Sequence, residues 1–183
     1  MTRRAILAGA GAAAALALAV PGAAAQAVPW GSGCKPASPG QPRTSLTCGA
    51  QLVDGRAIPP RGAPPAVKRA IAAANRIYGR PYVWGGGHAD FESRGYDCSG
   101  AVGYALHGGD LLSTTMVSGQ LAYWGSPGPG RWITVYANSK HVFMTIAGLR
   151  FDTRDSPAGV TGPRWHPYMP DTSNFVARHP AGL

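Results

Sequence analysis

The stretch that decides the fold of this chain is YDCSG, residues 96–100. It opens an apolar segment, residues 100–106, that ends in a histidine and two glycines. Asp97 suits the N-cap of a helix, because its carboxylate can accept the free backbone N–H groups of the first turn, and glycine suits a helix end. We therefore expect Cys98 at the first helical position, where the helix dipole and the unpaired amides stabilise a thiolate. By itself this stretch fits a reactive nucleophile and a buried structural thiol equally well.

Two further helices are expected around this segment. Residues 66–78 carry apolar side chains at helical spacing and end at Gly79, which predicts an amphipathic helix that supports the site. Residues 111–124 predict a shorter helix, capped by Ser113 or Thr114.

Beyond these helices the pattern changes to that of strands. From Trp132 onward the hydrophobic period is two, which is typical of half-buried strands. Three antiparallel strands joined by tight turns are predicted at residues 132–137, 141–147 and 150–153. The expected fold class is therefore α+β, with the Cys98 helix packed on a small antiparallel β-sheet.

Strand parity places a carboxylate beside a histidine. A hairpin loop with an even number of residues puts Asp152 on the same face as His141 of the middle strand, and Phe151 on the opposite face. We prefer that register because it buries Phe151. A thiolate nucleophile needs a base, and the base needs a third group to orient it. Cys98, His141 and Asp152 fill these roles in our interpretation, with His166 as the alternative third residue.

The N-terminal residues predict export. A short basic region with Arg3 and Arg4 precedes an apolar run, residues 6–20, and the alanines at 23–25 form a small-residue cleavage site. We interpret residues 1–25 as a signal peptide that uses either the general secretory route or the twin-arginine route. The apolar run is too short and too poor in large side chains for a membrane span, so we expect no integral span once the signal is removed.

The rest of the chain divides into an arm and one domain. Residues 26–63 are rich in proline and glycine and predict an irregular arm, and residues 64–183 form the expected domain. Two of the three cysteines, Cys34 and Cys48, lie close together in the arm, and in an exported protein we expect them to form a disulfide. Cys98 then remains as the odd thiol, which favours the reactive interpretation.

Composition limits the expected partners. The formal net charge of +9 falls to +7 when residues 1–25 are removed, because they carry two arginines and no acid. A basic exported protein meets anionic wall polymers, but its basic residues are scattered and carry no nucleic-acid motif, so we expect no nucleic-acid partner. We expect no metal and no cofactor, because zinc-ligand spacing and a phosphate-binding loop are both missing from the sequence. His88, next to the glycines at residues 85–87, is expected at the surface, with a place lining the cleft as the alternative.

Three motifs in this order resemble the NlpC-type cell-wall cysteine peptidases. They are YVWGG at residues 82–86, DCSG at 97–100 and HV at 141–142, and the likeness covers about residues 64–156. This family has a papain-like α+β fold and cuts the peptide stems of bacterial peptidoglycan. The resemblance implies that Cys98 is the nucleophile, His141 the base and Asp152 the third polar residue. It also implies substrate contacts for Tyr82, Asp97 and Ser99.

Two departures from the family pattern lie near the expected cleft. Phe143 replaces a small glycine two residues after the histidine, and Arg131-Trp132 replaces a Gly-Asp pair before it. Asp152 is also a less usual third residue than His, Asn or Gln. These differences bear on substrate preference more than on the nucleophile.

The resemblance implies an exported, monomeric peptidoglycan endopeptidase, secreted or associated with the cell wall, that cleaves stem-peptide amide bonds through a Cys-His-Asp triad. One alternative is an amidase or acyltransferase that acts on another wall component. A second alternative is a catalytically silent wall-binding protein of the same fold. Product mass separates hydrolysis from transfer, and labelling of the thiol separates an active site from a silent one.

Overall fold

A computed structural model describes residues 49–155 and 160–183 of the chain, and within them three helices and eight strands form the expected α+β fold. The helices are α1 (Pro65–Ile77), α2 (Cys98–Gly108) and α3 (Ser118–Leu121). The strands are β1 (Gln51–Val53), β2 (Arg56–Ile58), β3 (Ser126–Pro127), β4 (Ile133–Ala137), β5 (Val142–Ile146), β6 (Leu149–Asp152), β7 (Arg164–His166) and β8 (Val176–His179). Strands β1 and β2 form a hairpin, and the other six form one antiparallel sheet in the order β3-β8-β4-β5-β6-β7.

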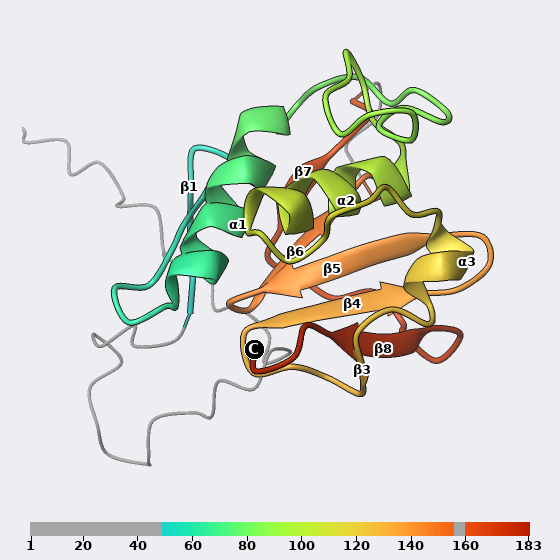
Figure 1. Cartoon of the computed structure of the whole chain (residues 1–183). Helices are drawn as coiled ribbons and strands as arrows, with labels where there is room; N and C mark the ends of the chain where they lie inside the picture. Colours follow the sequence, from blue (N-terminus) through green and yellow to red (C-terminus); the bar gives the residue numbers. More distant parts are fainter. Residues whose placement is uncertain (1–48, 156–159) are drawn as a thin grey trace, which may run out of the picture.

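The two long helices lie on the same face of this sheet (Figure 1). Helix α1 begins with Pro65 at a position where the missing N–H costs nothing, and its apolar residues are buried as the periodicity predicted. It packs against α2, which in turn contacts β5 and β6. The packing is close: a Cβ at Gly108 of α2 would meet the Cβ of Ala73 of α1. Packing of the two helices on the sheet places Cys98, the first residue of α2, at the end of the sheet where β5 begins.

Helix α2 also packs tightly against the glycine-rich loop that precedes it. A Cβ at Gly100 would meet the carbonyl oxygen of Gly86, and a Cβ at Gly86 would meet the carbonyl oxygen of Gly95. The backbone N–H of Asp97 donates to Gly86 O at 3.3 Å, which ties the loop to the helix start. Glycine is required at these positions because two backbone segments approach each other without room for side chains.

The β5–β6 hairpin has the register that parity predicted. Its loop has two residues, Ala147 and Gly148, with φ of 48° and 89°, and such positive values suit the two-residue turns whose twist matches that of the strands. Phe151 pairs with Met144 and both are fully buried in the core. The even loop therefore puts Asp152 on the other face, which it shares with Phe143 and Arg150.

Several elements differ from the expectation. Helix α3 has four residues and Val117 as its N-cap, so the proposed caps Ser113 and Thr114 were wrong. Two strands that the sequence did not predict, β7 and β8, lie in the C-terminal segment, where they pair with β6 and β4. The described part of the arm adds the β1–β2 hairpin, whose Ala57 is buried against α1.

Other expectations concern residues outside the described ranges. The signal peptide at residues 1–25 and the disulfide between Cys34 and Cys48 lie there, so both stay predictions. Among the described residues, no helix has the length and apolar character needed to cross a membrane.

Candidate active site

Cys98 is the first residue of α2, as the capping pattern predicted. Asp97 has extended backbone angles, and its Oδ1 accepts a hydrogen bond from Gly100 N at 2.9 Å, which caps the helix. Asp97 Oδ2 accepts a second bond from Gly85 N at 3.0 Å, so the cap also holds the glycine-rich loop. Cys98 is a free cysteine, largely buried, in the field of the helix N-terminus.

His141 lies immediately before β5 and is held by the β4–β5 turn. The side chain of Asn138 accepts hydrogen bonds from His141 N and Lys140 N, both at 2.9 Å, and Asn138 N donates to His141 O at 3.0 Å. The imidazole ring lies 6.3 Å from the rings of both Phe143 and Phe175, and its side chain is only 5% exposed. The two aromatic rings therefore flank the imidazole and contribute to its burial.

Asp152, at the end of β6, contacts the imidazole of His141. The distance from His141 Nε2 to Asp152 Oδ1 is 2.9 Å. The same oxygen accepts backbone bonds from Thr153 N at 2.7 Å and Arg154 N at 3.1 Å, which fix the carboxylate. Because Nε2 is engaged by Asp152, Nδ1 is the ring nitrogen that remains for the thiol of Cys98.

The electrostatics of the site favour a charged imidazole. Burial of the ring lowers the pKa of His141, but hydrogen bonds with Asp152 and Cys98, together with their negative charges, outweigh burial and raise it from 6.5 to about 9. His141 is therefore protonated at neutral pH. An imidazolium beside a cysteine is the arrangement that stabilises a thiolate.

His166, the alternative third residue, has a different environment. It lies on β7 opposite Arg150, and its Nε2 is buried without a hydrogen-bond partner among the described residues. Burial, followed by the charge of Arg150, lowers the pKa of His166 to about 4, so this ring is neutral at neutral pH. Of the two candidates, Asp152 is the one in contact with His141.

Of the three expected substrate-contact residues, Asp97 and Ser99 are the chain neighbours of Cys98, and Tyr82 lies within range of its charge. Burial, then the negative charges of Cys98 and Asp97, raise the pKa of Tyr82, and its side chain keeps a partly exposed surface. Ser99 is buried, and its Oγ donates to Asp97 Oδ1 at 3.1 Å. His88, expected at the surface, is instead half-buried, with Nε2 at 3.0 Å from both Asp97 Oδ1 and Ser99 Oγ. Sequence reasoning missed this contact because it depends on the fold of the loop at residues 85–95.

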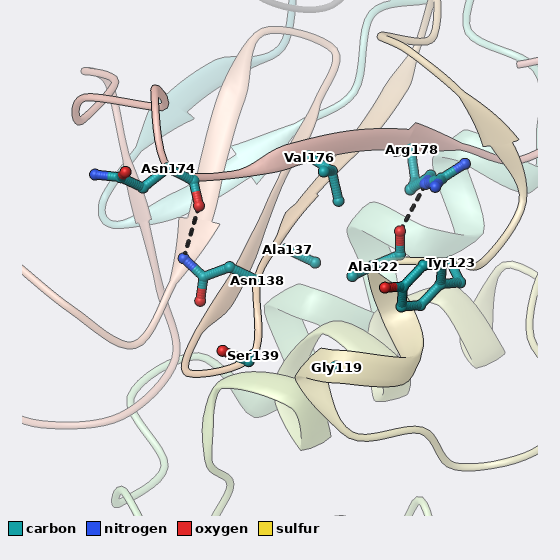
Figure 2. A pocket seen from close by; sticks show the side chains of 9 residues that line it. All are labelled: Gly119, Ala122, Tyr123, Ala137, Asn138, Ser139, Asn174, Val176 and Arg178. Atoms are coloured by element: carbon teal, nitrogen blue, oxygen red, sulfur yellow. Dashed lines mark hydrogen bonds between the residues drawn. The ribbon is translucent and has the colours of Figure 1, made fainter.

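A pocket of about 270 Å³ adjoins the turn that holds His141 (Figure 2). Its polar wall includes Asn138, whose Nδ2 donates to Asn174 O at 3.1 Å, and Arg178, whose Nε donates to Ala122 O at 2.7 Å. Asn138 thus connects the pocket with the backbone of His141. Within the described ranges, no cluster of His, Cys, Asp and Glu side chains is arranged to hold a metal ion.

Comparisons with known proteins add a similarity in fold. No protein-family model matches the chain, and no curated protein matches its sequence. Among solved structures, the chain is similar to the hypothetical invasion protein Rv1477 of Mycobacterium tuberculosis, with 25% identity and a TM-score of 0.47 over 62% of this chain and 61% of that chain. It is similar to the P60 domain of the antigen MAP1204 from M. avium subspecies paratuberculosis, with 23% identity and a TM-score of 0.46 over 62% of this chain and 93% of that chain.

A third similar structure is the peptidoglycan hydrolase RipB of Mycobacterium tuberculosis, with 26% identity and a TM-score of 0.47 over 62% of this chain and 64% of that chain. The chain thus spans less than two thirds of the length of Rv1477 and RipB. Two of these structures are described as a P60 domain and as a peptidoglycan hydrolase.

Proposed function

We propose that this protein is an exported cysteine peptidase that hydrolyses amide bonds in the stem peptides of peptidoglycan. The observation that carries the proposal is the position of His141, whose Nε2 lies 2.9 Å from Asp152 Oδ1 and whose pKa is raised by Asp152 and by Cys98. A nucleophile, a base and a group that orients the base are the three parts that acyl transfer through a cysteine requires.

The reaction begins with attack of the Cys98 thiolate on the carbonyl carbon of the amide. Negative charge develops on the carbonyl oxygen, and the backbone N–H groups of Cys98 and Ser99 in the first turn of α2, with the hydroxyl of Tyr82, are the donors we assign to it. The His141 imidazolium gives its proton to the leaving amine, and a thioester remains on Cys98. His141 then takes a proton from water, the resulting hydroxide attacks the thioester, and the thiolate leaves.

The substrate assignment rests on the motifs. Residues Tyr82, Asp97 and Ser99 match the family's cleft residues, and the hydrogen bond of Ser99 to Asp97 and the effect of the Cys98 charge on Tyr82 support this assignment. The positive charge of the chain favours attraction to anionic wall polymers. We propose that the mature protein is a monomer at the cell wall or in the surrounding medium.

Digestion of purified peptidoglycan tests the proposal. We expect the mature protein to release stem-peptide fragments whose masses include one added water for each cleaved bond, and Cys98→Ala to release none. Fragments joined to a new amine would instead identify a transferase, and release of whole stems from the glycan would identify an amidase. If wild-type protein releases nothing while Cys98 still reacts rapidly with a thiol alkylator, the peptidoglycan assignment is wrong although the site is reactive.

A further inference from the structure

Arg150 is a completely buried cation beside the proposed triad. It lies on β6 two residues before Asp152, so both side chains are on the same face of the sheet. Its Nε lies 3.7 Å from Asp152 Oδ2, the carboxylate oxygen that His141 does not use. This distance is too long for a hydrogen bond, so the interaction is one of charge. The two oxygens of Asp152 therefore face two different cations.

The guanidinium is held in place by groups that are themselves anchored. Arg150 Nη1 lies 2.9 Å from Asp155 Oδ2, and its central carbon lies 4.9 Å from the Tyr168 ring centre and 5.9 Å from that of Phe143. The hydroxyl of Tyr168 donates to Asp155 O at 3.0 Å, which joins two of these contacts. Rings and carboxylates thus surround the cation and partly compensate its burial.

Stability does not explain the choice of an arginine at this position. A buried charge carries a large desolvation cost, and well-packed apolar residues often replace buried ion pairs with no loss of stability. None of the three guanidinium nitrogens makes a well-directed hydrogen bond to another described residue. A group that is costly to bury and incompletely satisfied points to a role in the neighbouring site.

The charge of Arg150 is also constant. The other ionisable groups that face it are Asp152, Asp155, His166 on β7 and the hydroxyl of Tyr168. Arginine does not lose its proton in proteins, whereas His166 is neutral at neutral pH. Arg150 therefore supplies a positive charge next to Asp152.

We propose that Arg150 is a positioning residue, which attracts Oδ2 of Asp152 and so keeps the carboxylate turned with Oδ1 toward His141. Arg150 does not itself contact the imidazole or the thiol in this arrangement; it acts through Asp152. The proposal deepens the proposed function, but it predicts the reactivity of Cys98 and can be tested without a wall substrate.

The test is the rate at which iodoacetamide alkylates Cys98 at about pH 6, followed by intact mass in the folded mature protein. We expect Arg150→Met to slow alkylation about tenfold, within the usual range for coupled neighbours. Asp152→Ala should slow it at least as much. The double variant, with both Arg150→Met and Asp152→Ala, should react no more slowly than Asp152→Ala alone, because Arg150 affects the thiol only through Asp152.

A matched control is Arg164→Met. Arg164 is also buried and pairs with Asp152 across β6 and β7, but its guanidinium donates to the backbone oxygens of Thr161 and Gly162 and forms no ion pair with Asp152 among the described residues. We expect this variant to alkylate at the wild-type rate. Thermal unfolding of each variant shows whether a slow rate reflects loss of the fold. If Arg150→Met does not fold, Arg150→Lys, which keeps the charge, should fold and react faster than Asp152→Ala.

Four results would overturn the proposal. They are a wild-type rate in folded Arg150→Met, full additivity in the double variant, an equal loss in Arg164→Met, and a folded Arg150→Lys that is as slow as Asp152→Ala. If the variants show the expected alkylation rates but the wild-type protein does not digest peptidoglycan, the substrate assignment is refuted and the role of Arg150 is not. Where wall digestion is observed, Arg150→Met should lower kcat and leave KM unchanged, because the side chain does not reach the substrate.

Discussion

Replacing Asp152 with alanine should lower the pKa of His141 by a measurable amount. In the native site, hydrogen bonds and charges from Asp152 and Cys98 raise that pKa from 6.5 to about 9, against the effect of burial. This difference corresponds to roughly 3 kcal/mol of preference for the imidazolium, at about 1.4 kcal/mol for each pH unit. Because Asp152 and Cys98 share the effect, we expect Asp152→Ala to lower the pKa by about one to two pH units.

The assay is an NMR titration of histidine ring protons in the folded protein. His141→Ala assigns the signal, and His166→Ala serves as a matched control, because His166 does not contact the thiol or Asp152 through a hydrogen bond among the described residues. Wild-type His141 should titrate near pH 9 and the Asp152→Ala protein well below it. A wild-type midpoint close to 6.5, or a midpoint that does not change in Asp152→Ala, would refute the ion-pair reasoning.

The same substitution should have a stability effect that depends on pH. A histidine whose folded pKa is raised contributes stability that is fully present below about pH 6.5 and is lost as the pH rises through about 9. The difference in unfolding free energy between wild type and Asp152→Ala should therefore be largest near pH 6 and smaller above about pH 9, as measured by urea unfolding. A difference that is constant over this range would mean that Asp152 stabilises the fold only through its backbone hydrogen bonds.

Three further predictions concern the third residue, the helix start and the arm. In a peptidoglycan digestion assay, Asp152→Asn should lose less turnover than Asp152→Ala, because an amide oxygen still accepts the ring N–H. His166→Ala should retain near-normal turnover. If His166→Ala loses turnover while Asp152→Ala keeps it, His166 and not Asp152 is the residue that orients His141. Gly100→Ala should destabilise the fold by about 1–3 kcal/mol in urea unfolding, because the new methyl group meets the carbonyl oxygen of Gly86, and an unchanged midpoint would show that the loop yields easily. A chain that begins at Pro64 should fold with a lower Tm than the mature chain, since the described part of the arm buries alanines in the core, and an equal Tm would show that the arm adds nothing to stability.

Local sequence rules were sufficient for the parts of the site that depend on neighbours along the chain. The Asp97 cap and the start of α2 at Cys98 follow from a side chain reaching a backbone N–H three residues away. The placement of Asp152 on the face of His141 follows from the period of two and the two-residue loop between β5 and β6. Both inferences need only a few consecutive residues, because helix capping and strand parity are set by backbone geometry.

Tertiary structure decided the contacts between segments that are distant along the chain. His88 reaches Asp97 and Ser99 only because the loop folds back onto the start of α2, and β7 and β8 join the sheet only because β6 and β4 offer them free edges. The contact of His141 with Asp152 and not with His166 is also decided by tertiary structure, because pairing of β7 with β6 puts His166 opposite Arg150. Strand parity does indicate that Arg150 and Asp152 share a face, but the burial of Arg150 depends on Tyr168 and Asp155, which approach from other segments. The hydrophobic periodicity indicates which face of a helix or strand a residue occupies. Which residues of other segments lie against that face is determined by how the elements pack.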